Sequence, residues 1–291
     1  MYEPIYRPQL NGSFALLNHI HFGLVHEKKV IAIDDPSIEP LHMHGYLEIF
    51  FNISSEVSFL VNNRLYHVPH GSAVVSCSND IHMCIFEQTC SHDYFCLWID
   101  APESALLLPF LRQPNFSPLL IFDGETRHAL HTLLHALENV QNTAANKLEE
   151  ADLFLQLVLL LQKPQQPPSA ENAVPMELQK ILDHIDAYFP ELHSVNELTE
   201  IYFISPSTLN RWFQRYLHVS PHTFLESKKL AHAAQLLLQG KNVTDACMQS
   251  GFSDCSHFIR LFKKNFGETP LKYKQKQIDA ASCLPKQEIK L

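Results

Sequence analysis

The feature that most constrains the fold is a pattern that occurs twice near the end of the 291-residue chain. Each copy combines a short helix, a tight turn, a polar capping residue and a longer amphipathic helix. The copies are "HSVNELTEIYFISPSTLNRWFQRYL" and "KNVTDACMQSGFSDCSHFIRLFKKNFG". One such unit is also common in plain helical bundles, but two capped units whose second helix carries arginine predict DNA binding.

Capping residues set the expected helix ends in the first copy. Ser194 and Glu197 form a capping-box pattern before a short helix over 195–201. Ser205 is suited to cap the second helix, and Pro206 to its first position, where no backbone donor is needed. The residues expected on its buried stripe are Leu209, Phe213 and Leu217.

The second copy predicts the same architecture. Asn242 caps a short helix, Gly251 makes the turn, Ser253 caps the next helix, and Gly267 ends it in the left-handed conformation. The expected buried stripe is Phe258, Phe262 and Phe266, and the outward face offers Cys255, Ser256, His257, Arg260, Lys263 and Lys264.

Charge is distributed unevenly along the chain, whose net charge is −9. Residues 1–170 hold 8 basic and 18 acidic side chains, whereas residues 201–276 hold 11 basic and 4 acidic ones. An acidic part followed by a basic module of net +7 suits a polyanionic partner, although a solvated helical surface gives the same count.

The first hundred residues predict a β domain, and the residues after it predict helices. Short runs rich in β-branched and aromatic residues begin at 29–33 and continue to 94–99, with a hairpin closed by Asn62-Asn63. Two amphipathic helices follow, from about Glu125 and from Asn146 to Gln162. The Pro- and Gln-rich stretch 162–175 predicts an extended linker.

The C-terminal motifs resemble the DNA-binding domain of the AraC/XylS family of bacterial transcription regulators. The matching stretches are "SPSTLNRWFQRYLHVSPHTFL", "KKLAHAAQLLL" and "GFSDCSHFIRLFKKNFGETPLKY", within residues 180–275. The resemblance implies base reading by the second helix of each copy. The base-facing positions are then Ser207, Asn210, Arg211, Cys255, Ser256 and Arg260, and the phosphate contacts are Thr208, His257, Lys263 and Lys264. The alternative for each arginine is a surface salt bridge.

A helix of about 19 residues, from Pro221 to Gln239, separates the two copies. It spans about 28 Å at 1.5 Å per residue. With the turns added, the two reading helices would lie about 34 Å apart, the repeat of the double helix. One chain would then enter two successive major grooves.

The N-terminal domain carries the segment "HMHGYLE" and a later histidine, His82. The spacing of His42, His44 and Glu48 resembles the metal motif of cupin barrels, so that a cupin-like sensor domain is implied. We expect His42, His44, Tyr46, Glu48, His82 and Trp98 to bind a small ligand, with Phe50 and Phe95 as further apolar walls. A divalent metal on His42, His44, Glu48 and His82 is the alternative.

The seven cysteines form no CxxC pair. Four of them, Cys77, Cys84, Cys90 and Cys96, lie close in sequence, and we interpret them as buried reduced thiols rather than as a redox sensor.

These features together predict an α+β multidomain chain: a cupin-like β-barrel, then helices, then an all-α double helix-turn-helix domain. The expected parts are 1–120 (sensor), 121–163 (helical dimerisation segment), 164–175 (linker), 176–280 (DNA binding) and 281–291 (tail). The predicted function is a cytoplasmic, non-enzymatic regulator, an activator of a catabolic or transport operon controlled by a sugar effector. The expected partners are promoter DNA, RNA polymerase and a second copy of the chain, with no membrane and no cofactor. The alternatives are a metal-dependent cupin enzyme or a thiol redox sensor fused to the DNA-binding domain.

Overall fold

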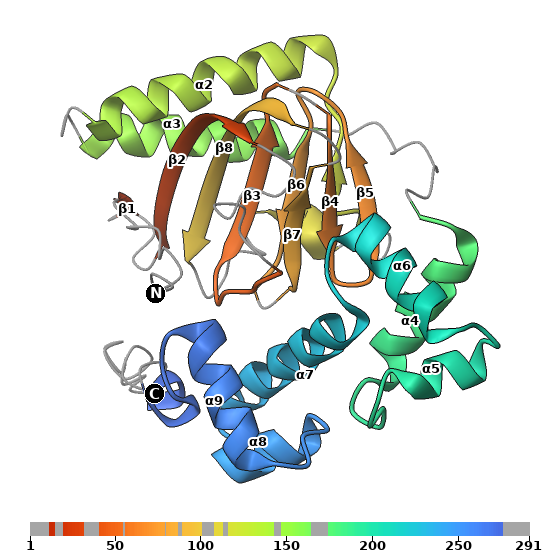
Figure 1. Cartoon of the computed structure of the whole chain (residues 1–291). Coiled ribbons are helices and arrows are strands. Elements are labelled where there is room, and N and C mark those ends of the chain that lie inside the picture. The colour runs from red at the N-terminus through yellow and green to blue at the C-terminus, as the bar shows by residue number, and fades with distance from the viewer. Residues whose placement is uncertain are drawn as a thin grey trace. The chain divides into compact units, whose positions relative to one another are not determined.

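The computed structural model of the chain (Figure 1) divides into two compact units, and the division falls between Gln179 and Lys180. The residues that it describes are 12–14, 20–31, 41–54, 56–78, 80–86, 89–100, 108–112, 116–142, 147–163 and 174–275. The predicted linker, up to residue 173, and the predicted tail lie outside these residues. A sheet-rich unit ahead of an all-helical unit confirms the expected α+β architecture.

Two antiparallel sheets build the first unit. Their strands are β1 (Gly12–Phe14), β2 (Ile20–Ile31), β3 (Leu47–Asn52), β4 (Val57–Val61), β5 (Arg64–Val68), β6 (Ala73–Ser76), β7 (His82–Ile85), β8 (Cys90–Asp100) and β9 (Leu119–Leu120). One sheet has the order β1-β2-β8-β3-β6-β9 and the other β5-β4-β7. Side chains of both sheets, among them Phe50, Phe59 and Trp98, share a core, which we call the barrel interior. The predicted barrel-like architecture is therefore present.

The strand predictions differ most from the structure at β2. The prediction began at residue 29, whereas β2 begins at Ile20 and pairs with β8 along its length, from His21 opposite Asp100 to Ile31 opposite Cys90. Glycine, histidine and glutamate weaken the local strand signal in "HFGLVHE", and pairing with β8 overrides it. The predicted hairpin is confirmed: Val61 pairs with Arg64, and Asn62 takes a φ of 55° in the two-residue turn.

Two helices, α2 (Gly124–Asn142) and α3 (Lys147–Leu161), cover one face of the six-stranded sheet (Figure 1). The Phe154 ring of α3 stacks on Phe22 of β2 with 4.1 Å between centroids. Both helices match the prediction within a residue or so. A short 3-10 helix, η2 (Pro109–Arg112), precedes β9. No helix among the described residues has the length and apolar content that crossing a membrane requires.

The helices of the second unit are α4 (Met176–Tyr188), whose first four residues precede the division, α5 (Asn196–Ile201), α6 (Pro206–Leu217), α7 (Pro221–Leu238), α8 (Val243–Gln249) and α9 (Cys255–Phe266). Helix α7 contacts α6, α8 and α9, so it joins the two helix-turn-helix copies, α5–α6 and α8–α9. The rings of Phe213 and Phe224 meet edge to face at 5.6 Å across the α6–α7 contact. A further helical segment begins at Pro270.

Candidate DNA interface and ligand site

The first helix-turn-helix copy is shaped by the predicted caps, with one shift. The Ser205 hydroxyl accepts a hydrogen bond from the Thr208 backbone N–H at 3.1 Å, as predicted. The Glu197 carboxylate accepts from the Ser194 N–H at 2.9 Å, which is half of a capping box. The Ser194 hydroxyl instead accepts from Asn196 at 3.1 Å, and α5 therefore begins at Asn196 rather than at residue 195.

The caps of the second copy include one correction. Asn242 caps α8 as predicted, since its side-chain oxygen accepts from the Asp245 N–H at 2.8 Å. The prediction that Ser253 caps α9 is wrong, because Asp254 does so and accepts from the Ser256 N–H at 2.7 Å. A carboxylate at a helix N-terminus also interacts favourably with the helix dipole, which a serine hydroxyl does not. The left-handed Gly267, with a φ of 72°, ends α9 as expected.

Buried contacts fix the two copies to each other. The Lys229 ammonium group of α7 donates to the carbonyl of Leu192, before α5, at 2.7 Å. It also donates to the carbonyl of Gly251, in the turn of the second copy, at 2.8 Å. Burial lowers the pKa of Lys229. Gly251 has a φ of 79°, and a Cβ there would lie 2.2 Å from the Pro190 carbonyl oxygen. The two copies are thus joined through α7, on which α6 and α9 both pack.

The outward face of α6 is polar and exposed, as predicted. Asn210 and Arg211 are exposed, whereas Thr208 is half-buried. The hydroxyls of Ser207 and Thr208 lie 2.8 and 2.9 Å from that of Ser205, so the cap holds both. Within the part of the chain that the structure describes, Arg211 is in no salt bridge with a carboxylate. The guanidinium group is therefore available for a partner outside the chain.

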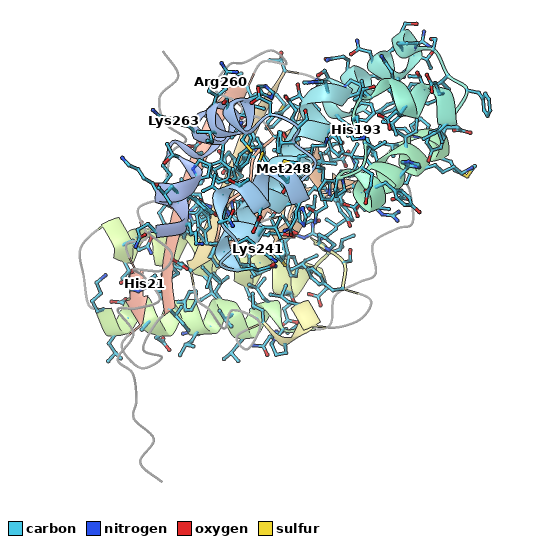
Figure 2. All side chains as sticks on the ribbon, turned by 90° about the horizontal axis from the view of Figure 1, so that it is seen from below. His21, His193, Lys241, Met248, Arg260 and Lys263 are labelled. Carbon is cyan, nitrogen blue, oxygen red and sulfur yellow. The ribbon has the colours of Figure 1, made fainter. Side chains whose placement is uncertain are left out.

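The outward face of α9 concentrates positive charge. Arg260 and Lys263 lie on this helix (Figure 2), and both are exposed, together with Lys264 and Ser256. No carboxylate of the described residues forms a salt bridge with Arg260. His257, predicted to contact phosphate, already has its Nε2 3.8 Å from Glu226, and the predicted core residue Phe266 is only half-buried.

Cys255 does not face outward as expected. It is half-buried, and its Sγ lies 2.8 Å from that of Cys247, which is fully buried in α8. Cys255 is the first residue of α9, where the side chain points back toward the preceding helix. Burial raises the pKa of Cys247 to about 12. The thiol contact secures the start of α9, and the assignment of base contacts to the other residues stays a prediction.

The predicted histidine cluster assembles around Glu48 in the barrel interior. The Glu48 Oε2 accepts from Trp98 Nε1 at 2.7 Å and lies 3.2 Å from His44 Nε2. His82 Nε2 lies 3.6 Å from Glu48 Oε1. One ligand atom from each of His42, His44, Glu48 and His82 lies within 4.8 Å of the others.

Strand parity does not account for this grouping, although it was the basis of the prediction. Strand β3 begins only at Leu47, so His42 and His44 precede it. An isolated antiparallel bridge between the backbones of His42 and His82 brings the segment to β7 instead. The four side chains therefore converge from three places in the fold.

The charge states of the cluster are set by burial and by hydrogen bonds. Burial alone would raise the pKa of Glu48, but the hydrogen bond from His44 and the neighbouring histidines lower it overall, so the carboxylate is ionised. Burial lowers the pKa of His82 well below its usual value, so this imidazole is neutral. His82 Nδ1 lies 2.9 Å from the Asp80 carbonyl and donates its proton there.

The second ring nitrogen of His82, Nε2, shows whether these residues are suited to bind a metal. Its Nε2 is buried and has no hydrogen-bond partner among the described residues. The lone pair of the unprotonated Nε2 and the ionised Glu48 carboxylate face each other without a positive charge between them. A divalent cation bound by both would supply that charge. The donor set of three imidazoles and a carboxylate thus fits the metal that the cupin resemblance implies.

Aromatic side chains line only part of the expected apolar wall. The Tyr46 ring stacks on His44 with 3.8 Å between centroids and meets Trp98 edge to face at 6.4 Å. Phe50 lies in the barrel interior with Trp98. The prediction for Phe95 is wrong, because alternation along β8 turns this ring to the opposite face, under the helices.

Sequence reasoning missed two features of the first unit. One is a hollow of about 460 Å³ beside Arg127, whose Nε is buried without a hydrogen-bond partner among the described residues. The other is a cluster of His26, His135 and Glu138 between β2 and α2. The spacing of histidine and glutamate in "HTLLHALE" signals one helix face, but no local signal connects it to β2.

The comparisons with known proteins agree with the C-terminal geometry. Residues 198–276 match a family model described as "Helix-turn-helix domain". The transcriptional activator RhaS of Enterobacter sp. (strain 638) is 25% identical over 249 residues, which cover 81% of this chain and 87% of RhaS. The uncharacterised regulator YbfI of Bacillus subtilis is 27% identical, with 75% and 80% covered.

A solved structure, a probable AraC family transcriptional regulator from Rhodopseudomonas palustris, is 32% identical. The match covers 37% of this chain and 98% of that one, with a TM-score of 0.32.

The chain is a DNA-binding transcription regulator of the double helix-turn-helix class. This follows from the two capped helices with exposed cations and from the matched helix-turn-helix domain. Residues 198–276 are thus a helix-turn-helix domain, and the chain around them is similar to transcription regulators such as RhaS.

Proposed function

We propose that this chain is a transcription activator of a catabolic or transport operon and that its two reading helices bind one promoter site. The observation that supports this most is that α6 and α9, both packed on α7, each present an exposed arginine that forms no salt bridge with a carboxylate of the described residues. Promoter DNA and RNA polymerase would be its partners, in the cytoplasm. The acidic first unit would then carry the signal rather than contact DNA.

The experiment that tests DNA reading is a map of the sites that the purified chain occupies on fragmented chromosomal DNA. A few sequence-selective sites beside transport or hydrolase genes are expected. Arg211→Ala and Arg260→Ala should each weaken binding at these sites by about 1–3 kcal/mol. Arg215→Ala removes the same charge from α6 outside the predicted base-facing positions and is the matched control. Occupancy without sequence preference would contradict the proposal.

The effector proposed for this regulator is a small polar molecule, a sugar, held around Glu48. The ionised carboxylate and the imidazoles can accept and donate hydrogen bonds to hydroxyl groups, and Tyr46 and Trp98 offer faces for stacking. Ligand binding would shift the population of the two-unit arrangements and so change promoter occupancy.

Glu48→Gln and His44→Ala test this site in a promoter-reporter assay with candidate sugars. Both should lose the response to effector while operator binding by the second unit persists. His67→Ala is the control, because this histidine of β5 is about half exposed and lies outside the cluster. An effector response that survives in both cluster variants would reject the site.

A metal bound by the same cluster is the second candidate, and His82 Nε2 favours it. Here the metal would polarise an oxygen of a bound ligand or substrate, while Trp98 would orient the Glu48 carboxylate. Near-stoichiometric metal that disappears in His82→Ala, together with turnover of a small substrate, would favour an enzyme.

A homodimer through α3 is part of the proposal. Leu148 and Leu159 are 67% and 64% exposed, and with half-buried Leu155 they stand at i, i+7 and i+11 on one helix face. Such an apolar stripe suits packing against a second helix. Leu159→Glu should give monomers in analytical ultracentrifugation, whereas Gln156→Glu, on an exposed position of the same helix, should leave dimers.

A further inference from the structure

A second group of titratable side chains lies on the opposite face of the sheet from Glu48. His26 of β2 stacks on the Phe95 ring at 4.1 Å, under the helices. His135 and Glu138 reach it from α2, and Asp93 reaches it from β8. We call these four residues the β2–α2 cluster. Nothing in the proposed regulator uses it.

Distances within the β2–α2 cluster match the first shell of a metal. His26 Nδ1 lies 3.2 Å from Glu138 Oε2, and His135 Nδ1 lies 3.2 Å from the same oxygen. One ligand atom from each of these three residues lies within 4.8 Å of the others. Ligands about 2.0–2.1 Å from a tetrahedral Zn²⁺ are about 3.3 Å apart, so two of the three edges already have that length.

The contact between His26 and Asp93 orients the His26 ring toward the metal position. His26 Nε2 lies 2.8 Å from Asp93 Oδ1, which fixes the ring and directs the proton of Nε2 to the carboxylate. The lone pair of Nδ1 then faces Glu138. This carboxylate–histidine arrangement is the usual second shell of metal-ligating histidine.

The same geometry requires a positive charge between the imidazole of His26 and the two carboxylates that it faces. Both ring nitrogens of His26 face carboxylate oxygens, at 2.8 and 3.1 Å, and a neutral imidazole donates from only one. Either a second proton or a metal cation must lie between His26 and Glu138. The side chains of His26, Glu138 and His135 are 19%, 27% and 38% exposed, so a metal can enter from solvent.

We propose that His26, His135 and Glu138 bind a divalent transition metal, of which Zn²⁺ fits the two-nitrogen, one-oxygen donor set best, with Asp93 as the outer-shell orienter of His26. A solvent molecule completes the coordination. The metal joins α2 to the sheet, so its occupancy stabilises the placement of this helix on β2 and β8.

The test uses Co²⁺ as a spectroscopic probe in the full chain carrying Glu48→Gln and His82→Ala, which disables the cluster in the barrel interior. One equivalent should bind and give the intense visible absorption of a tetrahedral site. Adding Glu138→Gln or His135→Ala should abolish the signal, and Asp93→Asn should weaken affinity about 10- to 100-fold. His128→Ala, an exposed histidine on the same helix, should leave it unchanged.

A parallel titration of the otherwise native chain guards against a background that misfolds. There, Glu138→Gln alone should remove one equivalent of Co²⁺, and added Zn²⁺ should raise the melting temperature less than in the native chain. Absence of saturable binding in the barrel-disabled chain, with its circular dichroism intact, would overturn the proposal. Equal stoichiometry in the native chain and the Glu138→Gln variant would overturn it as well.

Discussion

The two units of this chain hold their functional side chains in opposite ways. In the second unit, Asn210, Arg211 and Arg260 are exposed on α6 and α9. Their positions are set by the backbones of these capped helices rather than by contacts of their own side chains. In the first unit, Glu48 and His82 lie inside and are positioned by contacts with one another. Substitutions on the reading helices should therefore change binding and spare stability, whereas substitutions in the barrel should change both.

The largest effect should come from the interior of the DNA-binding unit. Phe262→Ala removes a fully buried ring of α9 that meets Phe258 and Tyr273 edge to face. It should cost about 3–5 kcal/mol of the free energy of unfolding, measured by urea denaturation. Ile259→Ala, on the partly exposed side of the same helix, should cost much less. Equal losses in the two variants would remove the distinction between the inside and the outside of this unit.

The next effect is an acid sensitivity specific to the first unit. His92 is fully buried among the rings of Phe50, Phe86 and Tyr94, and burial lowers its pKa to about 4. In the unfolded chain its pKa is about 6.5, so between pH 6.5 and 4 the unfolded state binds more protons. Stability should fall as the pH drops through this window, by up to about 3 kcal/mol.

His92→Phe should reduce this pH dependence, which can be followed as the urea midpoint from pH 7 to pH 4; buried His82, whose pKa is also lowered, accounts for part of what remains. His67→Ala, a surface histidine of the same unit, should leave the slope as in the native chain. If both variants keep the native slope, another group causes the acid sensitivity.

A smaller effect tests the caps that position the reading helices. Asn242→Ala removes the side-chain acceptor for the Asp245 N–H and should cost about 1 kcal/mol. Asn242→Asp keeps an acceptor and should cost little. Thermal unfolding of the second unit reports both, and DNA affinity should follow stability only weakly. A large loss of affinity in the alanine variant, with stability unchanged, would show that Asn242 itself contacts DNA.

The smallest effect concerns phosphate contacts on α9. Lys263→Ala should weaken binding to all sequences alike, and the slope of log K against log salt should become less steep by about one. Lys241→Ala removes an exposed charge in the loop before α8 and should leave that slope unchanged. Weaker binding at one sequence alone would reassign Lys263 from phosphate to bases.

Features with local causes were predictable from the sequence. Ser205, Pro206, Asn242 and Gly267 fix helix ends through the backbone groups beside them, and the structure confirms all four. The cap of α9 was assigned to Ser253 instead of Asp254 because both residues are good N-caps and are adjacent in the sequence.

Features that depend on distant pairing were not predictable in the same way. The contacts of His26 with Asp93 and Glu138 span 67 and 112 residues, and they depend on the β2–β8 register and on how α2 packs. Predicting that the Cys255 side chain points inward would have required knowing that Cys247 of α8 lies beside it. The grouping around Glu48 was predicted, although the His42–His82 bridge rather than strand parity produces it.

The most direct test of the central claim, that one chain reads two major grooves with α6 and α9, is binding-site selection from random DNA with the native chain, Arg211→Ala and Arg260→Ala. The account predicts that each variant loses discrimination at its own block of base pairs, and that the two blocks lie about 10 base pairs apart. Loss of discrimination at the same block in both variants, or at none, would contradict it.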